Sequence, residues 1–290
     1  MMDVIGSRFT EYGFPLHEDN DVIPDDDTTL FVCSGMQKLK NRFANPDGRT
    51  YGSVQSCIRT NDLDLVGDGS HLTFFQMIGN FSFGTNDYGR SVRMWRLILE
   101  DLGIKDYIVH YHPTRPDHRA LWDGCDLVED PECTWTDGEI GGECCEIYVD
   151  GLEIGNLVNT LGHSTDVGFG LERLIQVLSG KKRVDDTELF DGSMDPVVRD
   201  HVRTLKVMRN NRVQPGNKGR EYVCRRLLRR TLRLTPYIPG MDDWVRPELE
   251  LLDKRLNTAR KLWRKHQGKP HEWWWDTCGI LPEELDLCKT

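Results

Sequence analysis

The chain has 290 residues, nine cysteines and a net charge of −10 at neutral pH. Its length allows one large domain or two ordinary ones, each with a buried core. No apolar run reaches the 18 residues of a membrane-spanning helix, and residues 1–8 lack the features of a signal peptide. The sequence therefore excludes a helical membrane protein, and we expect no membrane partner.

The cysteines are odd in number and scattered along the chain. This usage is typical of reduced thiols, so the cytoplasm is the expected compartment. A zinc site deserves consideration, because five potential ligands lie fairly close in sequence: His118, Cys125, Cys133, Cys144 and Cys145. None of them has C-x2-C or H-x3-H spacing, so we predict no metal centre in this segment.

The first ninety residues contain strand-like runs and short helical segments. A short helix is predicted to begin within 8–12, and a β-like run over 28–33 leads into a polar–apolar segment over 34–43. Residues 54–59 and 71–78 are predicted strands joined by a loop rich in glycine and aspartate. We expect these two strands to form an antiparallel pair.

The pattern over 90–158 continues the sheet. A helix is predicted over 90–102, with apolar residues facing inward at Val92, Trp95, Leu99 and Leu102. Strands over 144–150 and 152–158 meet at Asp150-Gly151, which is a turn dipeptide. Strands followed late by a helix predict an α+β fold built on an antiparallel sheet.

The stretch 163–180 is the most informative part of the chain. A helix with one apolar face is predicted from the spacing of Leu171, Leu174, Ile175 and Leu178. Asp166, Gly168 and Gly170 precede it, and Arg173 points away from that face. Such a helix start suits a site for an amino group and phosphates, although a capped helix with a surface arginine explains this stretch equally well.

Charge divides the chain into two halves. Residues 1–198 have a net charge of −19 and residues 199–290 have a net charge of +9. Helices are predicted over 195–209, 220–234 and 247–266. We therefore predict two domains, 1–194 and 195–290, the second a helical domain whose basic side chains either bind RNA phosphates or form a solvated face.

Two arginines could hold a triphosphate. Arg59 ends one strand of the predicted pair, while His71, Met77 and either Phe74 or Phe75 line the other. Arg59 and Arg173 would bind the phosphates at either end, and Glu146 would help to hold magnesium. Taken singly, the aromatic residues are more typical of a core.

Three segments resemble the motifs of alanyl-tRNA synthetase, a class II enzyme. Residues 31–43 resemble its motif 1, residues 57–67 with 71–84 its motif 2, and residues 166–173 its motif 3. Residues 215–230 and 275–284 resemble its two tRNA-recognition segments. The resemblance implies a class II catalytic domain followed by a helical domain that recognises the tRNA acceptor stem.

The resemblance also implies residue roles. Arg59 and Arg173 would bind the α- and γ-phosphates of ATP, with Mg²⁺, and Asp166 would pair with the substrate ammonium. The ATP site would be completed by His71, Phe75, Met77 and Glu146. The alanine pocket would be shaped by Asn156, Val158 and Gly168. An acceptor-stem G·U pair would be read by Asn217 and Asp276, next to four basic residues: Arg220, Arg225, Arg226 and Arg229.

Several positions depart from the family pattern. Ser70, Leu72 and Gln76 stand where the family has arginine, histidine and glutamate, Gly155 replaces a tryptophan and Asn159 an apolar residue. The loop over 138–145 also differs, and Trp135 is the nearest candidate for the pocket tryptophan. The editing domain, its HxxxH zinc motif and the C-terminal region have no counterpart, so we expect serine to be mischarged.

Three functions remain open at this stage. The first is a minimal enzyme that forms alanyl-adenylate and charges tRNA(Ala), and retention of both arginines, Asp166, Asn217 and Asp276 favours it. The second is an adenylate-forming ligase that passes alanine or another small amino acid to a different acceptor. The third is an inactive paralogue that binds RNA.

Overall fold

A computed structural model describes residues 1–25, 27–190, 192 and 194–289. These residues form two compact units, Met1–Pro196 and Val197–Thr290. Within the described ranges, no helix is long and apolar enough to span a membrane.

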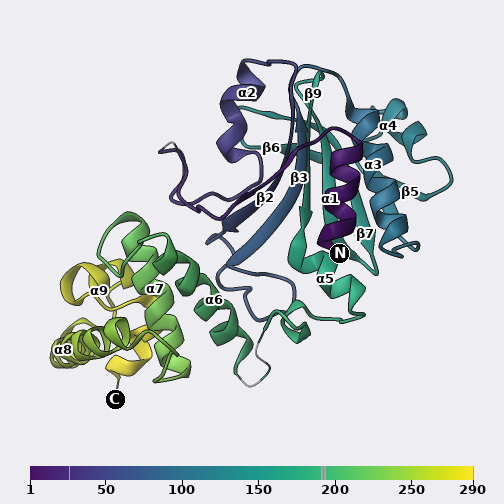
Figure 1. Ribbon diagram of the computed structural model, residues 1–290. Helices are drawn as coiled ribbons and strands as arrows, with labels where there is room; N and C mark the ends of the chain where they lie inside the picture. The colour runs from purple at the N-terminus through teal and green to yellow at the C-terminus, as the bar shows by residue number, and fades with distance from the viewer. Residues whose placement is uncertain (26, 191, 193, 290) are drawn as a thin grey trace. The chain divides into compact units, whose positions relative to one another are not determined.

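The first unit is built on a nine-stranded sheet (Figure 1). Its strands are β1 (Leu16–Asp19), β2 (Thr50–Ile58), β3 (Phe74–Ser82), β4 (Ile108–Tyr111), β5 (Asp126–Glu129), β6 (Thr134–Thr136), β7 (Gly141–Val149), β8 (Leu152–Thr160) and β9 (Ser164–Gly170). The order is β1-β2-β3-β9-β8-β7-β4-β5, with β6 paired to β7. Only β1–β2 and β4–β5 pair in parallel among the described strands, so the predicted α+β fold on a mainly antiparallel sheet is confirmed.

Helices cover one face of this sheet. They are α1 (Met2–Glu11), α3 (Tyr88–Asp101) and α4 (Pro116–Leu121). The α3 helix forms because its apolar residues recur every three to four positions, and Val92, Trp95 and Leu99 are fully buried as predicted. Trp95 stacks on Phe169 of β9 at 3.7 Å between ring centroids. This packing fixes β9, and so the segment that leads into the next helix.

The predicted hairpins are confirmed. Strands β2 and β3 pair antiparallel, with Cys57 opposite Phe75, and β7 and β8 pair antiparallel around the Asp150-Gly151 turn. The β-like run predicted over 28–33 is wrong, because that segment forms no strand. Its backbone makes isolated bonds in place of a ladder, among them those from the Val32 N–H to the Val22 carbonyl and from the Ile58 N–H to the Val32 carbonyl. It is followed by a 3-10 turn (Gln37–Leu39) and α2 (Lys40–Ala44).

Helix α5 (Leu171–Leu178) begins where the glycine-rich strand β9 ends. The apolar face predicted from 171, 174, 175 and 178 is only partly right. Leu174 is buried and Leu171 and Val177 pack beside it, whereas Leu178 is 40% exposed. The buried positions on this short helix include Glu172, because its carboxylate accepts a hydrogen bond from the backbone of Gln76 at 2.9 Å.

The second unit is helical. It contains α6 (Pro196–Asn210), α7 (Gly219–Leu234), α8 (Asp242–His266) and α9 (His271–Cys278), followed by a 3-10 segment (Pro282–Cys288). Helix α8 begins five residues before the predicted start, because Pro247 is accommodated inside it. Trp274 is fully buried among residues of α8 and α9. Trp274 therefore packs α9 onto its neighbours.

Candidate functional site

The site lies on the face of the sheet opposite α1 and α3. In antiparallel pairs, residues directly opposite each other project to the same face, and every second residue of a strand does so too. Glu146 lies opposite Asn156, and Asn156 lies opposite Gly168. Met77 lies opposite Gly170 on the neighbouring strand pair. The register therefore gathers residues from four strands onto one surface.

A cavity of about 310 Å³ opens on this surface, at the lower end of the usual range for ligand pockets. Eight of the predicted site residues line it: Arg59, His71, Phe75, Met77, Glu146, Asn156, Gly168 and Arg173. Four further positions noted in the sequence line it as well: Ser70, Leu72, Trp135 and Gly155.

The aromatic pair 74–75 is resolved by strand alternation. Phe75 lines the cavity and is half-buried, whereas Phe74 is 8% exposed and does not line it. The Arg59 guanidinium lies over the Phe75 ring at 4.9 Å from its centroid, and its Nε donates to the Cys33 carbonyl at 2.9 Å. These contacts hold an exposed arginine at the cavity mouth.

The small residues make space for specific neighbours. A Cβ on Gly168 would lie 2.7 Å from the Met77 sulfur, so a larger residue there would push the thioether away from this strand. The Gly35 N–H also approaches that sulfur at 3.4 Å. Glycine at 168 and methionine at 77 therefore define one wall together.

Arg173 is held by a residue that the sequence analysis did not predict. Its NH1 donates to the Glu153 carbonyl at 2.6 Å and to the Glu153 carboxylate at 3.2 Å. Glu153 also lines the cavity, together with Asp62 and Glu172. The sequence offered one indication of this role: Glu153 follows the β7–β8 turn and precedes the predicted site residue Asn156 by three positions.

Burial raises the pKa of the Glu146 carboxyl, and the charge of Glu153 adds to that effect, while a hydrogen bond from Tyr148 opposes it. The Tyr148 hydroxyl donates to Oε2 of Glu146 at 2.7 Å. Four carboxylates against Arg59, His71 and Arg173 make the cavity suitable for a nucleotide that brings a divalent cation.

Asp166 and Val158 do not line the cavity. They lie opposite each other on β9 and β8, one alternation beyond Gly168 and Asn156 on the same face. Asp166 is 8% exposed, and burial, with Asp137 as a second cause, raises the pKa of its carboxyl to about 7. Val158 packs with Cys133 and Cys144. This end of the site is therefore buried.

Asn159 lies outside the site, although the sequence analysis counted it among the changes there. It projects from the other face of β8, and its carboxamide oxygen accepts from Arg115 at 2.7 Å. The substitution therefore affects packing and not the site.

Two of the potential zinc ligands noted in the sequence have other partners. His118 stacks on Tyr88, and the Cys125 thiol donates to the Tyr107 hydroxyl.

In the second unit, Asn217 and Asp276 are both exposed. Tyr222 of α7 and Trp275 of α9 form an edge contact at 4.9 Å. This contact brings the start of α7 and the end of α9 together. Arg225 donates to the Asn217 carboxamide oxygen and to buried Glu248 at 3.0 Å.

Arg229 must be withdrawn from the predicted RNA-binding residues. Its side chain is fully buried, its Nε and NH2 donate to Glu284, and its NH1 donates to the Gly279 carbonyl at 2.8 Å. A guanidinium with these partners and no exposure is not accessible to a phosphate. Its position on the apolar side of α7, between Leu228 and Thr231, explains the difference.

Comparison with known proteins points to the same family as the sequence motifs. The family model of class II (A) tRNA synthetases matches residues 8–157 and 158–243. Alanine–tRNA ligases are similar in sequence. That of Magnetococcus marinus is 32% identical over 78% of this chain and 34% of its own length, and that of Paracoccus denitrificans is 32% identical over 87% and 36%. The chain thus spans about a third of the length of these relatives.

Two solved structures of pyrrolysyl-tRNA synthetase from Desulfitobacterium hafniense overlap this chain in part. One has a TM-score of 0.43 at 15% identity and covers 64% of this chain and 70% of its own. The other has a TM-score of 0.41 at 14% identity, over 64% and 71%. Overlap at this level supports no argument about function.

Proposed function

We propose, from the premise that this chain belongs to the class II (A) family of tRNA synthetases, that it activates alanine with ATP and transfers it to the 3′ end of tRNA(Ala). The observation that carries the proposal is that eight residues of the sequence motifs line one cavity. The similarity of alanine–tRNA ligases supports the choice of amino acid and acceptor.

ATP would bind with its adenine against Phe75 and Met77. Arg59 would hold the α-phosphate and stabilise the charge that develops there as the carboxylate attacks. Arg173 would hold the γ-phosphate, His71 would contact the phosphates, and Glu146 would hold Mg²⁺. Magnesium would neutralise phosphate charge when bound. For Arg173 this requires exchange of its contact with Glu153, which lies in the same cavity.

Alanine would bind at the buried end of the site, where Asp166 and Val158 lie just beyond the cavity residues Gly168 and Asn156. The charged carboxylate of Asp166 would pair with its ammonium group, and Asn156, Val158 and Gly168 would enclose its methyl group. A pocket shaped for a methyl group rejects an added hydroxyl only weakly. For the 290-residue chain we therefore expect serine to be activated at a measurable fraction of the rate for alanine.

The acceptor stem would be read by the second unit. Asn217 and Asp276 would contact the G·U pair, since an amide and a carboxylate complement the groups that a wobble pair exposes. The exposure of both side chains supports this assignment. Arg220 and Arg226 would bind the phosphate backbone. Arg225 would bind the RNA next to Asn217, to which its side chain donates a hydrogen bond.

The decisive experiment is charging of labelled alanine onto two tRNA(Ala) transcripts, one with the acceptor-stem G·U pair and one with G·C. We expect charging of the first only, and its loss in Asn217→Ala and in Asp276→Ala. Alanine-dependent pyrophosphate exchange should persist in both variants, because the adenylation site is in the other unit.

Two outcomes would contradict the proposal. Pyrophosphate exchange without charging of either transcript would indicate a ligase with a different acceptor. Absence of both reactions, with tRNA still bound, would indicate an RNA-binding paralogue. Arg59→Ala is the matched control, because it should abolish exchange and leave tRNA binding intact.

A further inference from the structure

A second group of chemically active side chains lies next to the cavity, where β4, β6 and β7 meet. Donor atoms of Cys133, Cys144 and Glu146 all lie within 4.8 Å of one another. Donor atoms of His110, Asp130 and Cys133 do so too. The two groups share Cys133, so they form one continuous cluster.

The sheet register brings these residues together. The backbone N–H of Cys144 donates to the carbonyl of Cys133 at 3.0 Å, which sets the two residues side by side. Cys144 and Glu146 alternate on β7 and so share a face, and the Cys144 thiol donates to Oε1 of Glu146 at 3.8 Å. His110 of β4 lies directly opposite Glu146.

Two of these groups already have outer partners. His110 Nδ1 lies 2.9 Å from the Asp130 carboxylate, and Tyr148 donates to Oε2 of Glu146 at 2.7 Å. Metal-bound histidines and carboxylates are oriented by hydrogen bonds of this kind. Since Nδ1 of His110 and Oε2 of Glu146 are engaged in this way, Nε2 and Oε1 are the atoms of these residues that would bind an ion.

We propose that Cys133, Cys144, Glu146 and His110 bind a thiophilic divalent cation of the Zn²⁺ type, with Asp130 orienting His110. Two sulfur donors select zinc-like ions over Mg²⁺ and Ca²⁺, which take oxygen ligands. The bond lengths of tetrahedral zinc sites, about 2.0 to 2.3 Å, set donors about 3.3 to 3.8 Å apart. Donors of Cys133, Cys144 and Glu146 lie within 4.8 Å of one another and need to close by about 1 Å, and His110 reaches the ion from its own group around Cys133. Binding releases the two thiol protons to solvent.

The cluster touches the cavity at two places. Glu146 lines the cavity directly, and Trp135 lines it while packing against Cys133 and Cys144. A bound ion would therefore fix this wall and withdraw Glu146 from the nucleotide. This consequence, inhibition of alanine activation by Zn²⁺, rests on the proposed function, whereas the binding itself does not.

The test is Co²⁺ titration of the reduced, metal-free full chain. We expect one ion per chain, a thiolate-to-cobalt charge-transfer band, and displacement by Zn²⁺. Cys133→Ser and Cys144→Ser should each abolish the band. Asp130→Asn should weaken binding about 10- to 100-fold, as the loss of an outer-shell partner does. Cys125→Ser is the matched control, since Cys125 lies outside the cluster.

A thermal measurement protects the test against variants that fail to fold. Saturating Zn²⁺ should raise the Tm of the wild-type chain and of Cys125→Ser by the same amount. The increase in Tm should be smaller for Asp130→Asn. A missing charge-transfer band in the wild-type chain would overturn the proposal, and so would a band that survives both serine substitutions. A metal-free protein with Cys133 and Cys144 joined as a disulfide would also overturn it.

Discussion

Asp166 is a buried carboxyl group that must be charged to bind an ammonium ion. Burial raises its pKa to about 7 from an ordinary value of 3.8, and the charge of Asp137 adds to the shift. The folded chain therefore holds this proton more tightly than the unfolded chain does. An alanine ammonium would supply the missing opposite charge.

We predict that kcat/KM for alanine rises with pH up to about 7 and then levels off. It should change about tenfold per pH unit below that value, because kcat/KM follows the ionisation of the free enzyme. Pyrophosphate exchange measured across pH, with alanine varied, checks this. Asp166→Asn should be nearly inactive and lack this dependence.

The Asp166 carboxyl also affects stability, but here the effect of raising the pH is unfavourable. Between about pH 4 and 7 the unfolded chain loses this proton while the folded chain keeps it, so the free energy of unfolding falls as pH rises through that window. Urea denaturation at several pH values should show a shallower decrease in Asp166→Asn. An equal slope in both proteins would contradict the assigned pKa.

Arg229 is a buried basic residue whose hydrogen-bond partners lie inside the protein. Its guanidinium is enclosed by Glu284 and the Gly279 carbonyl, with Glu248 at 3.9 Å. Removing one partner of a buried ion pair leaves the other charge desolvated and alone. This arrangement assigns Arg229 to stability of the second unit.

We predict that Arg229→Met lowers the free energy of unfolding by about 3 to 5 kcal/mol. Arg233→Ala, at an exposed position of the same helix, should change it by less than about 0.5 kcal/mol. Tryptophan fluorescence during urea denaturation is a suitable measurement, because five of the eight tryptophans lie in the second unit. Equal effects of both substitutions would contradict the structural role.

At the scale of elements, the packing of β8 against β9 explains a departure from the family pattern. Gly155 stands where the family carries tryptophan, and a Cβ there would lie 2.4 Å from the Phe169 ring. Phe169 in turn stacks on Trp95 of α3. The Phe169 ring thus fills the space next to Gly155, and this contact joins the sheet to its covering helix.

We predict that Gly155→Ala lowers the free energy of unfolding by about 1 to 3 kcal/mol through overpacking. Gly6→Ala, in helix α1 of the same unit, should instead raise it by about 0.5 to 1 kcal/mol, because its nearest neighbour would be 4.0 Å away. Far-UV circular dichroism during urea denaturation distinguishes the two. A neutral Gly155→Ala would mean that Phe169 can move aside.

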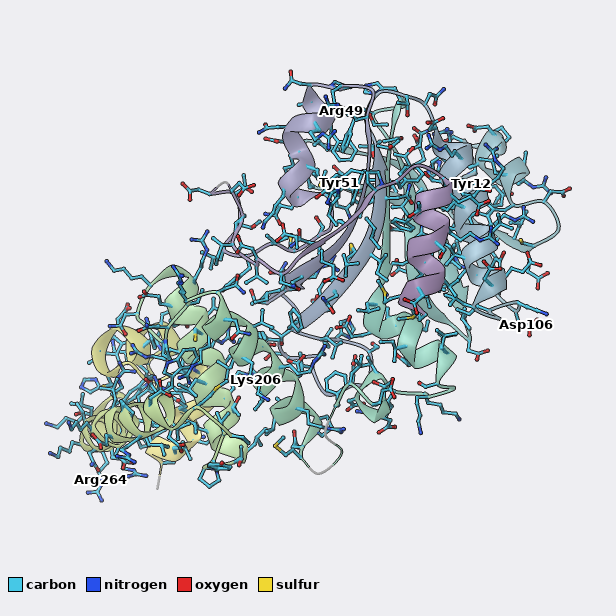
Figure 2. The ribbon with its side chains drawn as sticks, viewed as in Figure 1. Tyr12, Arg49, Tyr51, Asp106, Lys206 and Arg264 are labelled. Carbon is cyan, nitrogen blue, oxygen red and sulfur yellow. The ribbon has the colours of Figure 1, made fainter. Side chains whose placement is uncertain are left out.

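At the scale of the whole molecule, charge is separated between the units. The first unit has a net charge of −19 and the second of +9. Residues 254–269 add seven lysines and arginines without an acid, a run that the sequence analysis did not single out. Arg264 extends outward from α8 in Figure 2. A polyanion would be attracted to the second unit.

We predict that KM for tRNA rises at least tenfold between about 50 and 200 mM salt, because several phosphate contacts release counterions. KM for ATP in pyrophosphate exchange should rise less than about threefold, since the proposed nucleotide site is a partly enclosed cavity. Parallel charging and exchange assays over this range check the difference. An equal salt dependence would contradict separate sites.

Hydrophobic period and turn chemistry were enough to predict the β2–β3 and β7–β8 hairpins, α3, and the helices α6, α7 and α8 of the second unit, but not α9. They failed over 28–33, where an apolar run forms irregular chain and no strand. They also failed in part on α5, where Glu172 is buried because its carboxylate accepts a hydrogen bond from the Gln76 backbone. The four-residue strands β4 and β5 are too short to show a clear period, so the sequence did not reveal them.

The sequence by itself determined the α+β fold class, the resemblance to a synthetase family and the residues that could hold ATP, because motifs and periodicity are local properties. Only the tertiary structure decided that Phe75 rather than Phe74 faces the cavity, that Arg229 is buried, and that Cys133 meets Cys144 and Glu146. These facts depend on strand register and helix packing, which bring together residues distant in the chain.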